Sequence, residues 1–465
     1  MPVRPLTMAR QRLRARLSSA ALASERGAFL IEIVVSAALI GVVTIAVFAT
    51  FDGANAASGR NKARSVANSL AEQDQERLRA MPVQTLGTVS QTQTKTVDGV
   101  DYTVVSKGQW VTESTGANTS CTGGQKADYV RISSQISWRN MRLSKPIEQD
   151  SIVSPGPGTG GLGVLLKQRD GVTGTQGIPV SLSGPQSLNG TTDTAGCTFF
   201  GGLSTASYTI GATATGYTTT NWGVDQSDGI SPTGTSIGDT FTPSAGSTTV
   251  KTYLYDRAAT VNVTVNTKLW DGTIQNETTD ALSFENPNLG LTGVVVMGKS
   301  GVQRSSYSPN NVFPFSSAYS VYSGGCLGNN PTKYTMPPSV AQSVQADPAG
   351  AYNSAVREPA MNILVKNGAS VVPGSTVKVT PDTASPGTSM TGCSASFQFT
   401  TNSAGKLPDP AVPYGWWVVC ADGGATNRRI TKNIQNTNAD GLSAPGGVPT
   451  TVFDVNGAGS VKGSC

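Results

Sequence analysis

The sequence lacks histidine entirely and contains few charged residues, with Asp, Glu, Lys and Arg making up 14% of its 465 positions. Without histidine the chain has no Ser-His-Asp or Cys-His catalytic group and no imidazole ligand for zinc. A typical soluble domain is about 25% charged, so the polarity of this chain comes from its many Ser, Thr, Asn and Gln residues. We therefore expect no catalytic residues, no metal site and no cofactor, and we expect short β-strands joined by turns.

Net positive charge is confined to the first 27 residues. The formal charge of the whole chain is +5, but beyond residue 27 the basic and acidic residues cancel, and Glu25 is the only acidic residue before that point. A nucleic-acid partner would need a basic surface, which the sequence does not indicate. The basic residues of this leader are Arg4, Arg10, Arg12, Arg14, Arg16 and Arg26.

One long apolar run follows the leader, from Ala28 to Phe51, and Glu32 is its only charged residue. At 1.5 Å per residue a helix of this length extends about 36 Å, enough to cross a bilayer. The arginines that precede the run place its N-terminal end in the cytoplasm. The sequence therefore predicts a single transmembrane helix over residues 28–51, with the residues beyond 52 outside the cell membrane.

A glutamate in a membrane helix is energetically costly and requires a partner. The segment RGAFLIEIV, which contains Gly27, Ala28 and Glu32, resembles the processing site of type IV prepilins. In that family a basic leader ends in glycine, an apolar residue follows, and glutamate is the fifth residue after the cleavage point. The resemblance implies that a prepilin peptidase cleaves after Gly27 and that the new N-terminus at Ala28 is N-methylated. It also implies that Glu32 pairs with the N-terminal amine of a neighbouring subunit during assembly.

Two other interpretations of this N-terminus remain open. The helix is a simple signal anchor if Glu32 reaches the cytoplasmic interface by snorkelling. It is a secretory signal peptide if Ala54-Asn55-Ala56 serves as an A-x-A cleavage site, although the apolar run exceeds the usual length of about 7–15 residues. The combination of basic leader, glycine and glutamate favours the prepilin interpretation.

The helix is expected to continue beyond the membrane as far as Pro82. Between Ser58 and Met81 apolar residues recur close to i, i+3, i+4 and i+7 spacing, which indicates one apolar helix face. We therefore predict a helix over residues 28–82 whose first half is transmembrane and whose second half is amphipathic. The apolar positions of the second half are Ala63, Val66, Ala67, Leu70, Ala71, Leu78 and Met81.

Residues 83–153 are predicted to form a small antiparallel sheet that packs on the amphipathic half of the helix, as in pilin heads. In the segment Tyr129–Trp138 the residues Val130, Ile132, Ile136 and Trp138 alternate with polar residues. This alternation is typical of a strand with one buried and one solvated face. The segment Asp101–Trp110 is the expected neighbouring strand.

Beyond a glycine-rich linker, SPGPGTGG at residues 154–161, the chain has the character of tandem β modules. Residues 161–257 contain GIPVSLSG and TTDTAGCTFFGGLSTASYTIGATATGY, which resemble Cna protein B-type and carboxypeptidase-regulatory-like β-sandwiches. A weaker form of the pattern predicts a second sandwich at residues 359–465, and residues 258–358 are predicted to form a β module of unassigned type. The predicted fold class is α+β: a long N-terminal transmembrane and amphipathic helix with a small antiparallel sheet, followed by tandem all-β sandwich modules.

All six cysteines follow the apolar run, which suggests disulfide bonds in an exported region. Their spacing is too wide for a CxxC metal site, and six cysteines allow 15 connectivities. Because Cys393 and Cys420 fall within one predicted module, we expect them to pair. The remaining pairs are then predicted as Cys121 with Cys197 and Cys326 with Cys465.

Together these patterns predict a non-enzymatic, type IV pilin-like subunit that enters the membrane and then joins an extracellular filament. Its expected partners are the prepilin peptidase, the membrane and other pilin subunits, with an unknown surface ligand also possible for the β modules. The large size favours a minor or tip subunit. The alternatives are a surface adhesin anchored by one helix and a pseudopilin of a type II-like secretion system. A third alternative is an enzyme, but no acid pair or nucleophile spacing in the sequence supports it.

Overall fold

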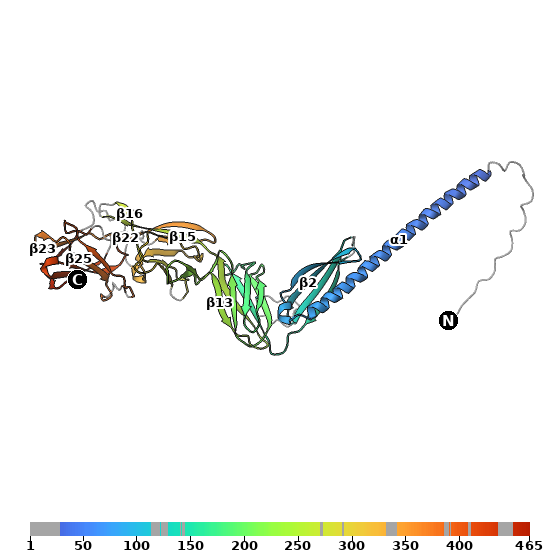
Figure 1. The fold of residues 1–465 in the computed structure, drawn as a ribbon, viewed down its shortest axis with the longest axis horizontal. Coiled ribbons are helices and arrows are strands. Elements are labelled where there is room, and N and C mark those ends of the chain that lie inside the picture. The colour runs from blue at the N-terminus through green and yellow to red at the C-terminus, as the bar shows by residue number, and fades with distance from the viewer. Residues whose placement is uncertain are drawn as a thin grey trace, which may run out of the picture. The chain divides into compact units, whose positions relative to one another are not determined.

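The computed structural model describes residues 28–112, 121, 129–139, 141, 145–269, 273–290, 293–331, 342–385, 390, 392–407, 411–435 and 450–465. It has a long N-terminal helix followed by many, mostly antiparallel, β-strands, so the predicted α+β class is confirmed (Figure 1). The chain divides into two compact units. The first comprises Met1–Asp74, Thr92–Val105 and Ser134–Gln149, and the second comprises Gln75–Gln91, Ser106–Ser133 and Asp150–Cys465.

The helix α1 runs without a break from Ala28 to Arg79. It ends three residues before Pro82, earlier than predicted, because the proline ring disfavours the helical conformation in the residue that precedes it. A single short turn, α2 (Val83–Leu86), then leads the chain into the first strand.

The first sheet, called the head sheet below, contains β1 (Ser90–Val97), β2 (Val100–Val111), β3 (Tyr129–Trp138) and β4 (Ile147–Val153) in that spatial order. Asp98 and Gly99 join β1 to β2 with positive φ angles of 50° and 75°, the backbone of a tight type I′ hairpin turn. As predicted, β3 is buried on one face at Val130, Ile132 and Ile136.

The apolar face of the second half of α1 packs on this sheet. Ala67 and Ala71 are fully buried, and they share a core cluster with Tyr102 and Val104 of β2 and Ile136 of β3. Alanines on the helix let its backbone approach the sheet closely, so the predicted packing of amphipathic helix on sheet is present.

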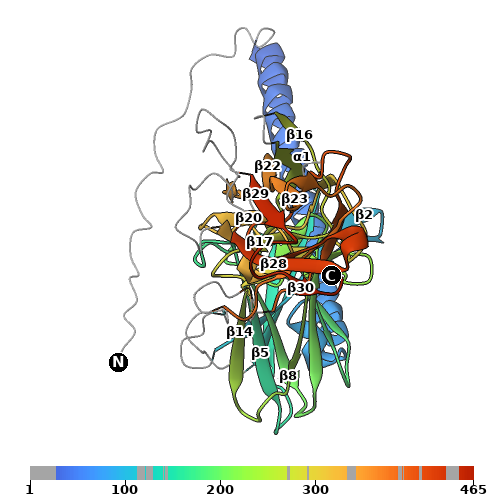
Figure 2. The same ribbon diagram turned by 90° about the vertical axis from the view of Figure 1, so that its left-hand side faces the viewer.

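Module A, at residues 160–257, is a β-sandwich. Its two sheets have the strand orders β10-β14-β5-β8 and β13-β9-β6-β7, and Figure 2 shows β14, β5 and β8 side by side. One core cluster joins both sheets, with Leu162 and Val164 from the first and Val180 and Ile210 from the second. The strands are β5 (Gly160–Lys167), β6 (Pro179–Ser183), β7 (Leu188–Thr191), β8 (Cys197–Leu203), β9 (Tyr208–Thr213), β10 (Tyr217–Thr219), β13 (Ser236–Phe241) and β14 (Thr248–Arg257).

Module B, at residues 258–359, also has two sheets. In one sheet β15 pairs in parallel with β22 and antiparallel with β16 and β19, and the other sheet has the order β18-β17-β20-β21. Its core also takes Trp222 and Val224 from a hairpin that precedes β13 in the chain, so a boundary at residue 257 does not separate the two cores. The elements are β11 (Gly223–Val224), β12 (Pro232–Thr233), β15 (Thr260–Lys268), β16 (Ile274–Asn276), β17 (Leu282–Glu285), β18 (Val294–Met297), β19 (Ser306–Tyr307), β20 (Tyr319–Ser323), η1 (Leu327–Asn329), β21 (Gln342–Val344) and β22 (Ala351–Pro359).

Module C, at residues 360–465, places a three-stranded sheet, β24-β23-β29, over a five-stranded sheet, β26-β25-β27-β28-β30. The buried side chains of Ile363, Val365 and Phe453 from the first sheet meet Val377 and Trp417 from the second. The elements are β23 (Ile363–Asn367), β24 (Ser370–Val371), β25 (Thr376–Pro381), β26 (Phe397–Thr400), β27 (Trp416–Asp422), η3 (Gly424–Thr426), β28 (Arg428–Gln435), β29 (Thr451–Asp454) and β30 (Val461–Lys462).

Candidate functional site

The first half of α1 carries an apolar surface that nothing in the described chain covers. Its large apolar side chains are 45–71% exposed, and α1 is long and apolar enough to cross a membrane. A soluble monomer rarely exposes a continuous apolar surface of this size, so lipid or other apolar helices must cover it. The exposed side chains are Leu30, Ile31, Ile33, Val34, Val35, Leu39, Ile40, Val42, Val43, Ile45, Val47, Phe48 and Phe51.

Glu32 lies within this apolar surface. Its side chain is exposed, and among the described residues it has neither a hydrogen bond nor an ion pair. A carboxylate in an apolar environment is energetically costly without a partner, and none is found among the described residues. Ala28 is the first residue of α1, and Gly27, the predicted residue before the cleavage point, lies outside the described residues.

Polar contacts hold the second half of α1 on the head sheet. Ser134 Oγ donates a hydrogen bond to Asp74 Oδ2 over 2.6 Å, and both residues are buried. At the surface, Lys62 Nζ lies 3.0 Å from Asp98 Oδ2, and this hydrogen bond raises the pKa of Lys62. The two halves of α1 thus differ: the second half is packed and hydrogen-bonded to the head sheet, whereas the apolar side chains of the first half are exposed.

A disulfide joins Cys121, which precedes β3 in the chain, to module A. Cys121 is bonded to Cys197 of β8, one of the pairs proposed from the sequence. Beside the bond, the rings of Trp110 and Phe199 meet edge to face at 5.9 Å, and Gln84 Nε2 donates to the Gly202 carbonyl oxygen at 2.9 Å.

A groove of about 730 Å³ opens next to this junction. Its lining combines the aromatic rings of Trp110 and Phe199 with the polar side chains of Ser181, Asn189 and Thr191. The Trp110 indole nitrogen is buried and makes no hydrogen bond to the described residues. The groove offers hydroxyl and amide groups beside two aromatic rings. The carboxylate of Asp193, also in its lining, accepts hydrogen bonds from the backbone N–H groups of Ala195 and Cys197.

Modules A and B share a core rather than a simple linker. Trp222 Nε1 donates to the Tyr319 hydroxyl oxygen at 2.9 Å, and that hydroxyl donates to the Phe313 carbonyl oxygen at 2.5 Å. Asn311 Nδ2 donates to the carbonyl oxygens of Gly223 and Thr233, at 2.7 and 2.8 Å. The hairpin is therefore fixed to module B by buried polar contacts as well as by apolar packing.

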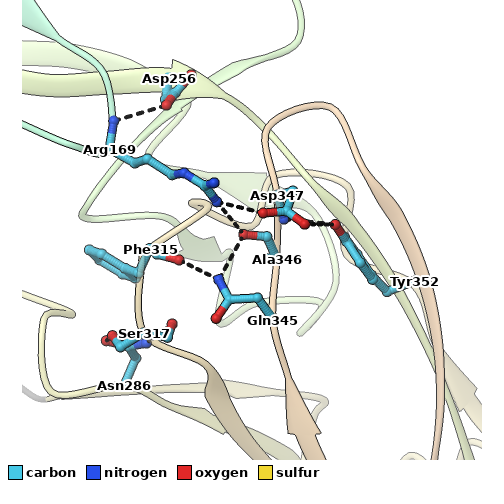
Figure 3. Close-up of polar contacts among 9 residues, drawn as sticks. All are labelled: Arg169, Asp256, Asn286, Phe315, Ser317, Gln345, Ala346, Asp347 and Tyr352. Atoms are coloured by element: carbon cyan, nitrogen blue, oxygen red, sulfur yellow. Dashed lines mark hydrogen bonds and ion pairs between the residues drawn. The ribbon is translucent and has the colours of Figure 1, made fainter. Parts of the chain in front are cut away.

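A second set of contacts crosses the same junction through Arg169, which follows β5 (Figure 3). Its backbone N–H donates to Asp256 Oδ2 at 2.9 Å, and its guanidinium donates to Asp347 Oδ1 at 2.7 Å and to the Ala346 carbonyl oxygen at 3.2 Å. Tyr352 donates to the other oxygen of Asp347 at 2.8 Å. The hydrogen bond from Arg169 is the main cause that lowers the pKa of Asp347.

Modules B and C are joined by the Cys326–Cys393 disulfide. Close to it, Asn329 Nδ2 donates to the Tyr414 carbonyl oxygen at 2.9 Å, and Asn329 is buried. The third disulfide, Cys420–Cys465, lies within module C and attaches the last residue to β27.

The predicted pairs Cys393–Cys420 and Cys326–Cys465 are therefore wrong. Val419 and Ala421 point into the core of module C and are fully buried, so Cys420 between them faces away from that core. Cys393 instead packs against the core. Two cysteines on opposite sides of a sheet cannot reach each other, and sequence proximity gave no information on this.

The sequence singled out none of the junction residues Arg169, Trp222, Asn311, Asn329 or Asp347. The only available signal was the position of Trp222, a large apolar residue in a polar, turn-rich segment that must be buried somewhere. Its burial against another module depends on contacts across 97 residues.

No family model matches the sequence, and no curated protein matches it. Among solved structures, the TIE protein of Bacillus anthracis is similar at 10% identity and a TM-score of 0.19, over 76% of this chain and 71% of that one. A minor pilin of Streptococcus agalactiae is similar at 11% identity and 0.20, over 43% and 94%. A variant of the major pilin subunit of Bacillus cereus is similar at 11% identity and 0.16, over 64% and 100%. At such low identities and scores, these likenesses carry no functional argument.

Proposed function

We propose that the chain is a type IV pilin-like subunit, inserted in the membrane as a precursor and assembled into an extracellular filament through α1. The observation that carries this proposal is the uncovered apolar half of α1 with Glu32 in it. The other half of the same helix is already packed on the head sheet. A helix that is packed within its own subunit along one half, with the other half exposed and apolar, is suited to packing against helices of other subunits.

Processing between Gly27 and Ala28 supplies the partner that Glu32 lacks. Cleavage creates a new amino group at Ala28, four residues before Glu32, which corresponds to about 6 Å along a helix axis. The carboxylate of one copy pairs with the amine of the next, and the two charges neutralise each other away from water. Because the axial offset is fixed, this pairing sets the register of neighbouring helices. The prepilin peptidase and other pilin subunits are the partners in this proposal.

The β modules follow the head sheet and form the part of the subunit that faces the exterior. Their number favours a minor or tip subunit over a shaft subunit, since three modules are attached to every head. In this proposal the modules carry no catalytic activity, and the groove beside Trp110 and Asn189 is available to a surface ligand.

The deciding experiment is the N-terminal mass of the mature protein extracted from membranes. We expect a chain that starts at N-methylated Ala28, and we expect the Gly27→Leu variant to keep its leader. An intact N-terminus in the unmodified chain would instead indicate an anchored adhesin, and a start at Ala57 a secreted protein. A pseudopilin starts at the same residue as a pilin, so recovery of the protein from sheared surface filaments separates those two.

A further inference from the structure

A pocket of about 250 Å³ lies where α1 leaves its apolar segment and meets the head sheet. Its wall on α1 includes Ala57, Arg60 and Arg64, and the facing wall comprises Trp138 and the nearby residues Met141 and Lys145. All of these residues belong to the first compact unit.

The three cations of this pocket have no acidic partner among the described residues. Arg60 Nε donates to the Ala56 carbonyl oxygen of its own helix at 3.1 Å, while Arg64 and Lys145 form no ion pair in the described part of the chain. Lys62, between the two arginines in sequence, differs because it pairs with Asp98 at 3.0 Å. The pocket therefore holds uncompensated positive charge, although basic and acidic residues balance beyond the leader. Its ligand must carry negative charge.

The facing wall adds an apolar surface beside these cations. Trp138 is partly buried, with its ring 5.9 Å from that of Tyr102, and its backbone N–H contacts the Met141 sulfur at 3.3 Å. An indole and a thioether provide polarizable contacts for hydrocarbon. A ligand that satisfies both walls is an amphiphile, with an anionic group next to apolar chains.

The position of the pocket along α1 matches the headgroup layer of a bilayer. Side chains on a helix point toward its N-terminus, and the Arg60 hydrogen bond places its Nε at the level of Ala56. Ala56 lies five residues beyond Phe51, or about 7 Å along the axis. The headgroup region extends roughly 5–8 Å beyond the hydrocarbon core. Trp138 lines the wall of the pocket that faces α1, and tryptophan is enriched at the interface between membrane and water.

Basic residues in this place also run against the charge rule for membrane insertion. Lysine and arginine next to a membrane-spanning segment are usually on the cytoplasmic side, but Arg60 and Arg64 follow the apolar segment of α1 at the end opposite the leader. Their presence there opposes the orientation that the leader sets, so a binding role offers a physical reason for them.

We propose that this pocket binds the phosphate of an anionic phospholipid in the leaflet nearest the head sheet. This inference rests on the proposed function, because only a membrane-inserted subunit brings the pocket to that surface. Arg60 and Arg64 hold the phosphate, Lys145 closes the charged rim, and Trp138 and Met141 contact the upper acyl chains. Binding keeps the head sheet against the membrane until assembly draws the helix out of the bilayer.

The test uses the full chain reconstituted in phosphatidylcholine vesicles. In separate samples, a fraction of either the phosphatidylglycerol or the phosphatidylcholine carries a nitroxide at the top of its acyl chain, where it quenches nearby tryptophan emission. The emission of Trp138 is obtained as the difference between the unmodified chain and the Trp138→Phe variant, and its quenching by each labelled lipid is compared. We expect a preference for the labelled phosphatidylglycerol that the Arg60→Gln/Arg64→Gln variant lowers by on the order of 25-fold. Basic residues at an anionic surface contribute about fivefold each. The matched control is Lys62→Gln, which lies between them outside the pocket and is expected to change the preference less than twofold.

Three outcomes overturn the proposal. Equal quenching by both labelled lipids would show that the pocket does not select the anion. An equal loss in Lys62→Gln and in the double variant would reduce the effect to general surface charge. Displacement by inorganic phosphate at constant ionic strength would point to a free anion rather than a lipid. Flotation of the vesicles is checked first: a chain that fails to float overturns the membrane function as well, whereas a chain that floats without lipid preference overturns the pocket alone.

Discussion

Trp222 donates its indole N–H to the hydroxyl of Tyr319 over 2.9 Å, although 97 positions separate the two residues. The contact carries a hairpin from the sequence of module A into the core of module B, where Trp222 meets Phe284 and Tyr319 edge to face. Two neighbouring modules that share core residues cannot rotate freely about a linker. The junction between modules A and B is therefore a folded interface in its own right.

Removing the Trp222 ring is expected to destabilise module B. Trp222→Ala leaves a cavity and is expected to lower the free energy of unfolding by about 3–5 kcal/mol, while Tyr319→Phe leaves the buried indole N–H unpaired and costs about 1–3 kcal/mol. Hydrogen exchange of β17 and β20 in the full chain measures both effects. The control is Arg169→Gln, which breaks a partly exposed ion pair and is expected to cost at most about 1 kcal/mol. Unchanged protection in Trp222→Ala would show that the hairpin does not support the core.

The Cys326–Cys393 bond is expected to fix the angle between modules B and C. In the Cys326→Ser/Cys393→Ser variant the Asn329–Tyr414 hydrogen bond remains, but a single such bond contributes only about 1 kcal/mol. We expect the distance distribution between probes on the two modules to widen at least twofold. The Cys420→Ser/Cys465→Ser variant removes a bond within module C and should leave that distribution unchanged. Similar distributions in both variants would contradict this role.

Glu358 is expected to make module B less stable as the pH rises. Its carboxyl is almost completely buried and bonded to Ser323, and burial raises its pKa to about 7, against the opposing effect of hydrogen bonds from Ser323 and Thr279. The unfolded chain releases this proton near pH 4.3, so between about pH 4.3 and 7 only the folded state holds it. Stability then falls by at most about 1.4 kcal/mol per pH unit, roughly 4 kcal/mol in all, and is level above pH 7.

Thermal unfolding of the full chain from pH 4 to pH 8 tests this behaviour. Glu358→Gln keeps a neutral, hydrogen-bonding side chain, so module B of this variant should lose the pH dependence and be more stable than the unmodified chain at pH 8. An identical pH slope in the variant would assign the dependence to other groups.

Replacing Glu32 is expected to block assembly without blocking insertion. In Glu32→Ala the helix becomes more apolar, so it still enters the membrane, but the charge that pairs with a neighbouring N-terminus is gone. We expect at least a tenfold loss of the protein from sheared filaments and no change in its membrane fraction. Glu72→Gln removes an exposed carboxylate from the same helix and serves as the control. Normal incorporation of the Glu32 variant would remove this residue from the mechanism.

Much of the fold followed from local patterns in the sequence. The apolar run and the 3.6-residue periodicity predicted α1, and alternation at Val130, Ile132 and Ile136 predicted the buried face of β3. These signals are readable because the period of a helix or strand is set by the backbone alone. The cysteine pairs could not be predicted in this way, because the direction of the Cys420 side chain depends on which face of β27 packs against the core.

The sequence by itself determined the apolar helix, the single charge at Glu32 and the β character of everything beyond the head. These depend on composition and on residues within a few turns or one strand of each other. Only the tertiary structure decided that Trp222 completes the core of module B, that Cys326 and Cys393 join two modules, and that Arg60 faces Trp138 across a pocket. Each of these relationships joins segments far apart in the chain. Which of these distant segments come into contact depends on how whole sheets pack, and a local sequence pattern does not predict that.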